Sequence, residues 1–362
     1  MKKKIAIIAP YLGMIDRGAE SFVKEIADLL AEYYEIDFFT ITGKTELPGN
    51  NIGIPIKHSF LFIIHERIFN RFKLYRKVIW KLYYLIPDII TQFKFSRVVY
   101  HKYLLCKQYD LIFPNNGIWG VVYAQKLRKQ KGTPFIYTGH GGVGEGEKLI
   151  LKRKPNMYIC LTERQYTWAR QYSDKICVIG NGVDTKKFHR HKADHLPKLV
   201  LSVGALTEFK RHELTIKALQ YIPDVNLLIL GKGELERELV GLAKKLLGDR
   251  CIIKSASYED MPFYYENADL FVLPSSKGEA YGIVYLEAMA SNLPIVAPDD
   301  SMRHEIIGDA GLFCDVTNPK EYGRCMELAL NKQWGDIPLE TAKKHDWSEV
   351  SKKYIEVIEG LI

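Results

Sequence analysis

The sequence lacks the features of several specialised protein classes. Its six cysteines stand far apart, with no Cys-x-x-Cys pair and no His-rich partner spacing, so neither a zinc site nor a redox dithiol is indicated. No window offers the ~20 uncharged apolar residues that a membrane-spanning helix needs. The most apolar basic-flanked stretch, residues 78–90, already contains Lys81 and Asp88. These absences favour a protein of a reducing cytosol that does not cross a membrane.

The composition is typical of a globular protein with two or three domains. The chain has 362 residues, of which 47% are apolar and 26% charged, and roughly 150 residues make a domain. Its first residues are basic and then apolar, like a signal peptide, but the apolar run stops at Pro10 without a small-residue cleavage site. We therefore expect residues 4–9 to form a first buried strand.

The net charge of +8 is concentrated in residues 57–108, the basic aromatic segment. This segment holds 11 Lys and Arg residues against Glu66 and Asp88, and it also holds 12 aromatic residues. Cations interleaved with aromatic rings suit contact with an anionic bilayer surface. Two alternatives are a helical pair with an aromatic core and solvated cations, and a nucleic-acid-binding surface.

Short apolar segments alternate with amphipathic helices in both halves of the chain, which is typical of parallel α/β sheets. The first half contains predicted strands at residues 4–9, 111–113 and 135–138, and a predicted helix at 19–33. The second half contains predicted strands at residues 199–203, 226–230, 251–254, 270–273 and 294–297. We predict two Rossmann-like domains rather than one large sheet.

A polar joint separates the two halves. Asn181-Gly182 marks a turn, and the strand periodicity restarts at Leu199. We predict an N-terminal domain over residues 1–185 and a C-terminal domain over 186–342. The final helix, within 343–362, is expected to cross back and pack on the N-terminal domain. A cleft between two such domains is a common ligand site.

The most informative stretch of the second half carries two glutamates. Glu279 stands in a glycine-flanked loop after a strand, and Glu287 stands on the helix that follows. A rise of ~1.5 Å per residue places the two carboxylates on the order of 10 Å apart, too far for the pair of a retaining glycosidase. We interpret them as two contacts with one long ligand. The amides of Gly282, Ile283 and Val284 lie between them and form a candidate diphosphate site.

Seven short motifs occur in order along the chain. They are G-A-E (18–20), G-H-G-G (139–142), I-G-N-G-V-D-T-K-K-F (179–188), V-G-A-L-T-E-F-K-R (203–211), L-G-K-G-E (230–234), A-D-L-F-V-L-P-S (268–275) and the paired-glutamate segment. In this order they resemble the retaining GT-B glycosyltransferases of family 4, which transfer sugars from nucleotide donors. The resemblance implies an α/β fold with two Rossmann-like domains facing across a cleft, and neither a cofactor nor a metal ion.

The resemblance also implies roles for residues at matching positions. Glu279 would bond hydroxyls of the donor sugar, Glu287 would hold the ribose of the nucleotide, and Lys210 would neutralise the leaving diphosphate. The alternatives are a helix N-terminal carboxylate for Glu279 and a surface helix residue for Glu287. His140, in a glycine-rich loop after a strand, would line the donor-sugar pocket or be only a turn residue.

Two positions depart from the family's pattern. Ala205 stands where the family usually has an arginine, and Arg211 either supplies the missing charge or faces solvent. Arg17 replaces the first of two adjacent glycines, where it adds a cation near the phosphates or marks loop drift. The loop from Gly13 to Gly18 precedes a helix and lets backbone approach the diphosphate.

These observations lead us to expect a retaining, metal-independent hexosyltransferase without a cofactor. Its partners would be a nucleotide diphosphate sugar and an acceptor bound by the first domain, with no nucleic acid. The basic aromatic segment suggests a lipid-linked oligosaccharide or glycolipid acceptor, and a cytoplasmic protein that is peripheral on the inner face of the plasma membrane. The alternatives are a nucleotide-sugar epimerase of the same fold and a non-catalytic nucleotide or nucleic-acid binding protein.

Overall fold

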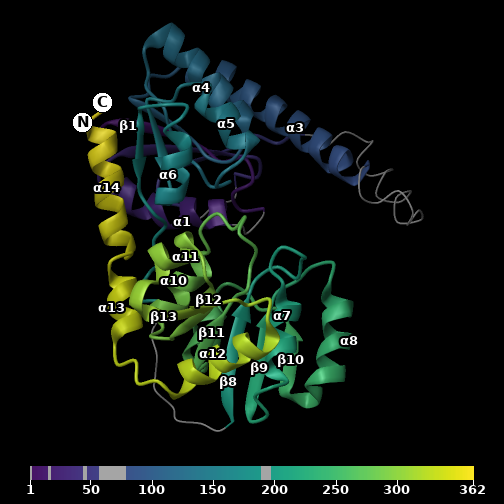
Figure 1. The fold of residues 1–362 in the computed structure, drawn as a ribbon. Coiled ribbons are helices and arrows are strands. Elements are labelled where there is room, and N and C mark those ends of the chain that lie inside the picture. Colours follow the sequence, from purple (N-terminus) through teal and green to yellow (C-terminus); the bar gives the residue numbers. More distant parts are fainter. Residues whose placement is uncertain (1, 15–17, 44–46, 57–78, 189–196) are drawn as a thin grey trace. The chain divides into compact units, whose positions relative to one another are not determined.

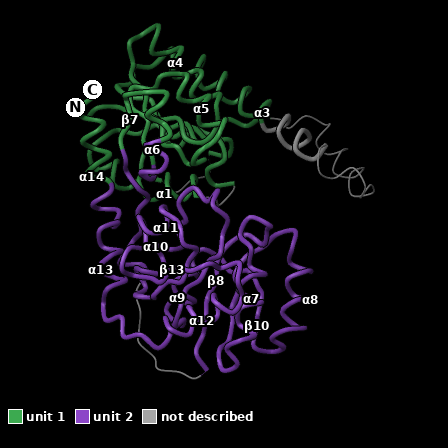
Figure 2. The backbone as a smooth tube through the Cα atoms, in the orientation of Figure 1, with its two compact units in different colours: residues 1–160, 168–177, 351–362 green, residues 161–167, 178–350 purple. Residues whose placement is uncertain are grey.

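The computed structural model describes residues 2–14, 18–43, 47–56, 79–188 and 197–362 (Figure 1). Arg17 and residues 57–78 of the basic aromatic segment lie outside the described residues. The chain divides into two compact units (Figure 2). Unit 1 comprises Met1–Cys160, Trp168–Cys177 and Ser351–Ile362, and unit 2 comprises Leu161–Thr167 and Val178–Val350.

Unit 1 is built on two sheets that one bridge connects. The first sheet has the order β3-β2-β1-β4, and the second has the order β5-β6-β7. A parallel bridge between Ile112 and Phe135 links them. The strands are β1 (Lys4–Ile8), β2 (Glu35–Thr40), β3 (Asn50–Gly53), β4 (Leu111–Pro114), β5 (Ile136–Thr138), β6 (Met157–Cys160) and β7 (Ile176–Val178).

Strand β1 is central to the first sheet because it pairs in parallel with both β2 and β4. Its apolar side chains are at most 2% exposed. The described residues of unit 1 form the helices α1 (Gly18–Ala31), α3 (Ile79–Val99) with its π-helical continuation η2 (Tyr100–Leu104), α4 (Ile118–Lys131) and α5 (Glu145–Leu151). Helices α6 (Glu163–Ala169) and α14 (Trp347–Glu359) have residues in both units.

Residues 351–362 belong to unit 1 and pack on its core. The hydroxyl of the fully buried Tyr354 lies 3.0 Å from Thr138 Oγ1. The same ring lies 5.5 Å from the ring of Phe22 and stacks on Phe113 at 6.2 Å. Tyr34 donates a 2.6 Å hydrogen bond to Glu359 at the end of the segment. These contacts tie the C-terminal segment to α1, β4 and β5.

Unit 2 carries a six-stranded sheet of order β10-β9-β8-β11-β12-β13, in which every pair of neighbours is parallel. The strands are β8 (Lys198–Val203), β9 (Val225–Leu230), β10 (Cys251–Lys254), β11 (Leu270–Val272), β12 (Ile295–Pro298) and β13 (Gly311–Cys314). The helices are α7 (His212–Leu219), α8 (Glu236–Leu246), α9 (Met261–Glu266), α10 (Ile283–Ala290), α11 (Ser301–Ile307), α12 (Pro319–Asn331) and α13 (Ile337–Lys343), with short 3₁₀ turns η3 (Gly248–Arg250) and η4 (Gly308–Ala310).

Two hydrophobic cores cover the two faces of this sheet. Leu201 and Phe271 belong to the core that includes residues of α9, α10, α11 and α13. Val200 and Leu270, their neighbours in sequence, belong to the core that includes residues of α7, α8 and α12. Alternate strand residues therefore face opposite helical layers, as in a Rossmann-like unit. The predicted α/β fold class is confirmed.

Within the described residues, no helix is both long and apolar enough to cross a membrane.

Candidate active site

Three loops meet at the carboxyl ends of β8, β9 and β11 in unit 2, where parallel sheets bind their ligands. The amide of Leu206 donates a 2.9 Å hydrogen bond to Lys232 O, and the amide of Ser276 donates a 2.9 Å bond to Phe209 O. A Cβ atom on Gly231 would stand 2.0 Å from Gly204 O. Position 231 therefore requires a residue without a side chain. We conclude that the glycines of residues 231–233 allow the loops after β8 and β9 to pack closely.

A salt bridge joins two of the predicted site residues. Lys210 Nζ lies 2.5 Å from Glu279 Oε2, and the two side chains are 19% and 11% exposed. The Glu279 amide also donates a 3.1 Å bond to Ser276 O, which fixes the loop that carries the carboxylate. The structure thus places a carboxylate, which can accept hydrogen bonds from hydroxyl groups, next to an ammonium group at the carboxyl edge of the sheet.

Two arginines hold the loop after β11 by its carbonyl groups. Arg211 donates from Nε to Pro274 O at 2.7 Å and from a terminal nitrogen to Ser275 O at 3.0 Å. Arg303 donates to Ser275 O at 2.9 Å and to Ser276 O at 3.2 Å. Arg211 therefore contacts the protein rather than facing solvent freely, and its role toward a ligand stays a prediction.

Arg303 is a residue that the sequence analysis missed. Its side chain is fully buried, and it also contacts Asp300, the Ser275 hydroxyl and the Tyr285 hydroxyl. The one signal in the sequence is the spacing Asp300-x-x-Arg303 at the start of α11. A buried guanidinium persists only when its donors are satisfied, and here the loop carbonyls satisfy them.

Glu287 lies inside unit 2 rather than on the surface of α10. The residue is 5% exposed, and the hydroxyl of the fully buried Tyr265 donates a 2.8 Å bond to its Oε2. Burial and this carboxylate hold the pKa of Tyr265 well above its usual range. The alternative of a surface helix residue is therefore wrong, and Tyr265 is a second contact that the sequence analysis did not predict.

Gly282 directly precedes α10 and has a φ of 87°, a left-handed conformation that favours glycine. The half-buried Ile283 and Val284 form the first turn of the helix, where amides lack intrahelical partners. The structure places these amides just after the loop that carries Glu279. Their use as a diphosphate site stays a prediction.

His140 belongs to unit 1, where it follows β5. Its ring lies 4.7 Å from that of Phe22, and its Nε2 atom is buried without a hydrogen-bond partner among the described residues. Burial lowers the pKa of His140 to about 3, so the imidazole is neutral at physiological pH. A neutral ring with one unused nitrogen can still accept or donate one hydrogen bond to a ligand.

The loops next to His140 and after β1 are fixed in different ways. The amide of Gly141 donates a 2.8 Å bond to the buried Glu147, whose pKa burial raises to about 7. Gly13 has a φ of 77°, which again favours glycine, and Gly18 begins α1.

The predicted site residues are divided between the two units. Unit 2 contains Lys210, Arg211, Glu279 and Glu287, whereas unit 1 contains Gly13, Gly18 and His140.

Across the ranges that the structure describes, no group of three or more His, Cys, Asp or Glu residues could hold a metal ion.

Two family models match the chain, one over each half. The model described as Glycosyl transferases group 1 matches residues 183–354, and the model described as Glycosyltransferase Family 4 matches residues 17–187. Together they account for most of the sequence.

Curated relatives match mainly over part of their length. An uncharacterised glycosyltransferase of Haemophilus influenzae is 31% identical over 54% of this chain and 58% of its own. A phosphatidyl-myo-inositol mannosyltransferase of Mycobacterium tuberculosis is 27% identical over 50% of this chain and 53% of its own. The chain thus spans a little more than half the length of these relatives.

Several solved structures match over nearly the whole chain. Sucrose-phosphate synthase from Thermosynechococcus elongatus has a TM-score of 0.75 at 19% identity and covers 99% of both chains. The Anabaena protein HepE, solved with UDP-glucose, has a TM-score of 0.71 at 16% identity over 99% of this chain and 100% of its own. At these identities the likeness shows a shared fold.

Proposed function

Because the chain belongs to the GT-B glycosyltransferases of group 1 and family 4, we propose that it transfers a hexose-type sugar from a nucleotide diphosphate sugar to an acceptor with retention of anomeric configuration. The observation that carries this proposal is the pair of Lys210 and Glu279 beside the start of α10. The solved structure of HepE with UDP-glucose supports a nucleotide-sugar donor.

The donor would occupy the carboxyl edge of the unit 2 sheet. Glu279 accepts hydrogen bonds from sugar hydroxyls, and Glu287 accepts them from the ribose. Donor binding frees Lys210 from its salt bridge in part, so that its ammonium neutralises the diphosphate. The amides at the start of α10 contribute partial positive charge to the same group.

The reaction follows from this placement. The bond between the anomeric carbon and the diphosphate oxygen breaks, and the acceptor oxygen bonds to the anomeric carbon on the same face. The proton of the acceptor hydroxyl passes to the departing phosphate. Lys210 and the α10 amides stabilise the negative charge that develops on this leaving group, so catalysis depends on positioning and electrostatics without a metal ion or a cofactor.

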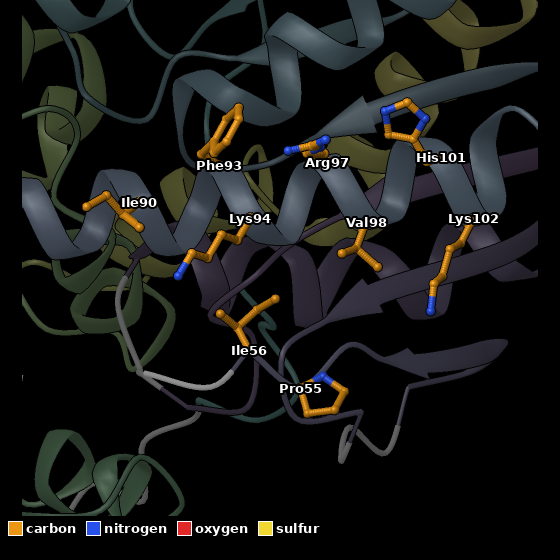
Figure 3. A pocket seen from close by; sticks show the side chains of 9 residues that line it. All are labelled: Pro55, Ile56, Ile90, Phe93, Lys94, Arg97, Val98, His101 and Lys102. Atoms are coloured by element: carbon orange, nitrogen blue, oxygen red, sulfur yellow. The ribbon is translucent and has the colours of Figure 1, made fainter. Parts of the chain in front are cut away.

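The acceptor is a lipid-linked oligosaccharide or glycolipid at the cytoplasmic face of a membrane. Helix α3, its continuation η2 and residues 55–56 line a pocket of about 820 Å³ in unit 1. Figure 3 shows Ile56, Ile90 and Val98 among its apolar residues, and Lys94 and Arg97 among its cationic ones. Apolar surface beside exposed cations suits an anionic lipid surface. Two relatives have names that include a lipid group. They are the mannosyltransferase above, whose name includes phosphatidyl-myo-inositol, and a Campylobacter jejuni N-acetylgalactosaminyltransferase, whose name includes diphospho-undecaprenol.

A donor-turnover assay tests the proposal. The full chain is incubated with UDP-, GDP- and ADP-sugars, and release of the nucleoside diphosphate is measured with and without a membrane lipid extract. Glu279→Gln should lower release at least about 100-fold, because the site loses charge beside the reacting sugar. The control is Glu238→Gln. Glu238 is exposed on α8, so this variant should release the nucleoside diphosphate at the wild-type rate. An isomerised nucleotide sugar formed without lipid extract would contradict transfer.

A further inference from the structure

Two buried oxygen atoms in unit 1 have no hydrogen-bond partner among the described residues. Glu20 is 2% exposed and Asn115 is 3% exposed. Glu20 Oε2 and Asn115 Oδ1 are both buried and unpaired. An unpaired buried acceptor costs free energy, and native proteins keep few of them. Such atoms therefore point to a group that is present when the protein works.

Hydrogen bonds hold both side chains in place. Asn115 Nδ2 donates a 3.1 Å bond to Ala19 O, and Asn116 Nδ2 donates a 2.9 Å bond to Glu20 Oε1. Each side chain thus uses one polar atom to bind the other loop and keeps one acceptor unused. Asn116 has a φ of 60° and Gly117 a φ of 109°. Asparagine and glycine tolerate these conformations better than other residues, so the residues after Asn115 suit this turn.

The place of these residues in the sheet is that of a ligand site. Strand β1 pairs with β2 on one side and with β4 on the other. The chain therefore leaves β1 and β4 in different directions, and such a switch in strand order is where open α/β sheets bind ligands. Asn115 directly follows β4, and Glu20 lies in the first turn of α1, the helix after β1.

We propose that Glu20 and Asn115 bind hydroxyl groups of the acceptor, so that the acceptor is a saccharide or polyol where the new sugar is attached. This inference rests on the proposed transferase function. Both unpaired atoms are hydrogen-bond acceptors, so they require a ligand that donates. Hydroxyl groups donate, whereas a phosphate or carboxylate would be repelled by the Glu20 carboxylate. A lipid-linked acceptor thus presents its sugar here and its anionic group elsewhere.

Binding of neutral glycosides to the full chain tests the inference. The probes are octyl glucoside, galactoside, mannoside and N-acetylglucosaminide below their micelle concentrations, measured by ligand-observed NMR. Calorimetry with UDP, GDP and ADP runs in parallel. We expect Glu20→Gln and Asn115→Ser each to weaken glycoside binding at least about tenfold, because each removes an acceptor that the hydroxyl needs. Nucleotide affinity should stay within about twofold.

Asp37→Asn is the matched control. Asp37 is a fully buried carboxylate of the same sheet, and its oxygens already have partners in Lys4, Asn50, Lys107 and Tyr109. Its substitution should change the thermal midpoint and leave glycoside binding intact. If the Glu20 variant does not fold, the wild type still provides a test, since a bound glycoside should shift the side-chain amide resonances of Asn115 and Asn116.

The outcomes separate the two proposals. Unchanged glycoside affinity in either variant, or unshifted asparagine resonances with glycoside bound, would overturn the acceptor site. No glycoside binding by the wild type would overturn the saccharide class. Failure of the wild type to bind any nucleotide would overturn the transferase function itself.

Discussion

Individual buried side chains hold the predicted site residues of unit 2 in position. Tyr265 holds Glu287, and Arg303 holds the loop that ends at Glu279. The proposed reaction uses neither side chain, so each acts as a positioning residue. Single substitutions here should therefore affect stability and donor binding together.

Arg303→Lys tests this support. A lysine cannot reach the carbonyls of Ser275 and Ser276 and the Tyr285 hydroxyl at once, so buried acceptors lose their donors. We expect the free energy of unfolding to fall by about 2 kcal/mol, and the donor KM to rise more than kcat falls. Chemical denaturation and steady-state kinetics measure these effects. The exposed Arg237→Lys in α8 is the control, and equal behaviour of the two variants would contradict the positioning role.

Glu147 gives unit 1 a pH dependence. Burial raises its pKa to about 7, although the Tyr158 hydroxyl and the Gly141 amide bond to it. A folded pKa above the unfolded value of about 4.5 means that its stabilising contribution is complete below pH 4.5 and lost as pH rises through 7. Glu147→Gln should therefore be less destabilising at pH 8 than at pH 5. Thermal midpoints at the two pH values measure this, and a pH-independent difference would contradict it.

Among individual residues, sequence patterns predicted the groups that are proposed to contact a ligand and missed the buried side chains that hold them. Lys210, Glu279 and Glu287 stand in motifs that the sequence displays. Glu20 was seen only as part of a motif, and Arg303 was not singled out, because their importance depends on burial and on partners far away in sequence. Burial of a charged residue leaves no mark in the local pattern.

At the scale of elements, close backbone contacts between loops shape the carboxyl edge of unit 2. Gly231 and Gly233 admit the backbone of Gly204 and Leu206, whose carbonyl oxygens would stand 2.0 and 2.3 Å from an added Cβ. The loop after β8 that carries Lys210 therefore depends on glycines in the loop after β9.

Gly231→Ala tests this dependence. Its Cβ would collide with a carbonyl oxygen, so the two loops must separate, and we expect a loss of about 2 kcal/mol in stability together with weaker nucleotide binding. Gly241→Ala is the matched control, since an added Cβ meets nothing within 4 Å on the exposed face of α8. It should stabilise by about 0.5–1 kcal/mol. Equal thermal midpoints of the two variants would contradict the account.

Strands β8 to β12 of unit 2 were predicted well because each is a short apolar run between turn residues, whereas β13 was not predicted. Strand β2 was missed, and Asp37 explains why. This residue interrupts the apolar pattern of β2. It is nevertheless fully buried, because Lys4 and Tyr109, which are distant in the sequence, contact its carboxylate. Tertiary partners thus permitted a charge in a position that local periodicity assigns to apolar residues.

At the scale of the whole molecule, charge is unevenly distributed. The net charge of +8 comes from residues 57–108, and the described part of that segment places exposed Lys94, Arg97 and Lys102 along α3 and η2. Each such cation near an anionic bilayer contributes about 1 kcal/mol at low salt. The surface charge and the proposed lipid acceptor therefore both lead us to expect that α3 and η2 bind an anionic membrane surface.

Replacing Lys94, Arg97 and Lys102 with glutamine should weaken binding to vesicles that contain 30% phosphatidylserine by about 100-fold. Replacing Arg237, Lys244 and Lys245 with glutamine removes the same charge from α8 in unit 2 and serves as the control. Vesicle sedimentation at fixed salt measures both. Equal loss in the two variants would show a general charge effect and contradict a membrane-binding role of α3.

Calorimetric titration of the purified chain with UDP, GDP and ADP tests for a donor site at the carboxyl edge of the unit 2 sheet. We expect that one nucleotide binds selectively, that Glu287→Ala weakens this binding at least about tenfold by removing the ribose contact, and that Glu20→Gln leaves it unchanged. Binding of no nucleotide, or binding that Glu287→Ala does not alter, would contradict a donor site at the carboxyl edge of the unit 2 sheet.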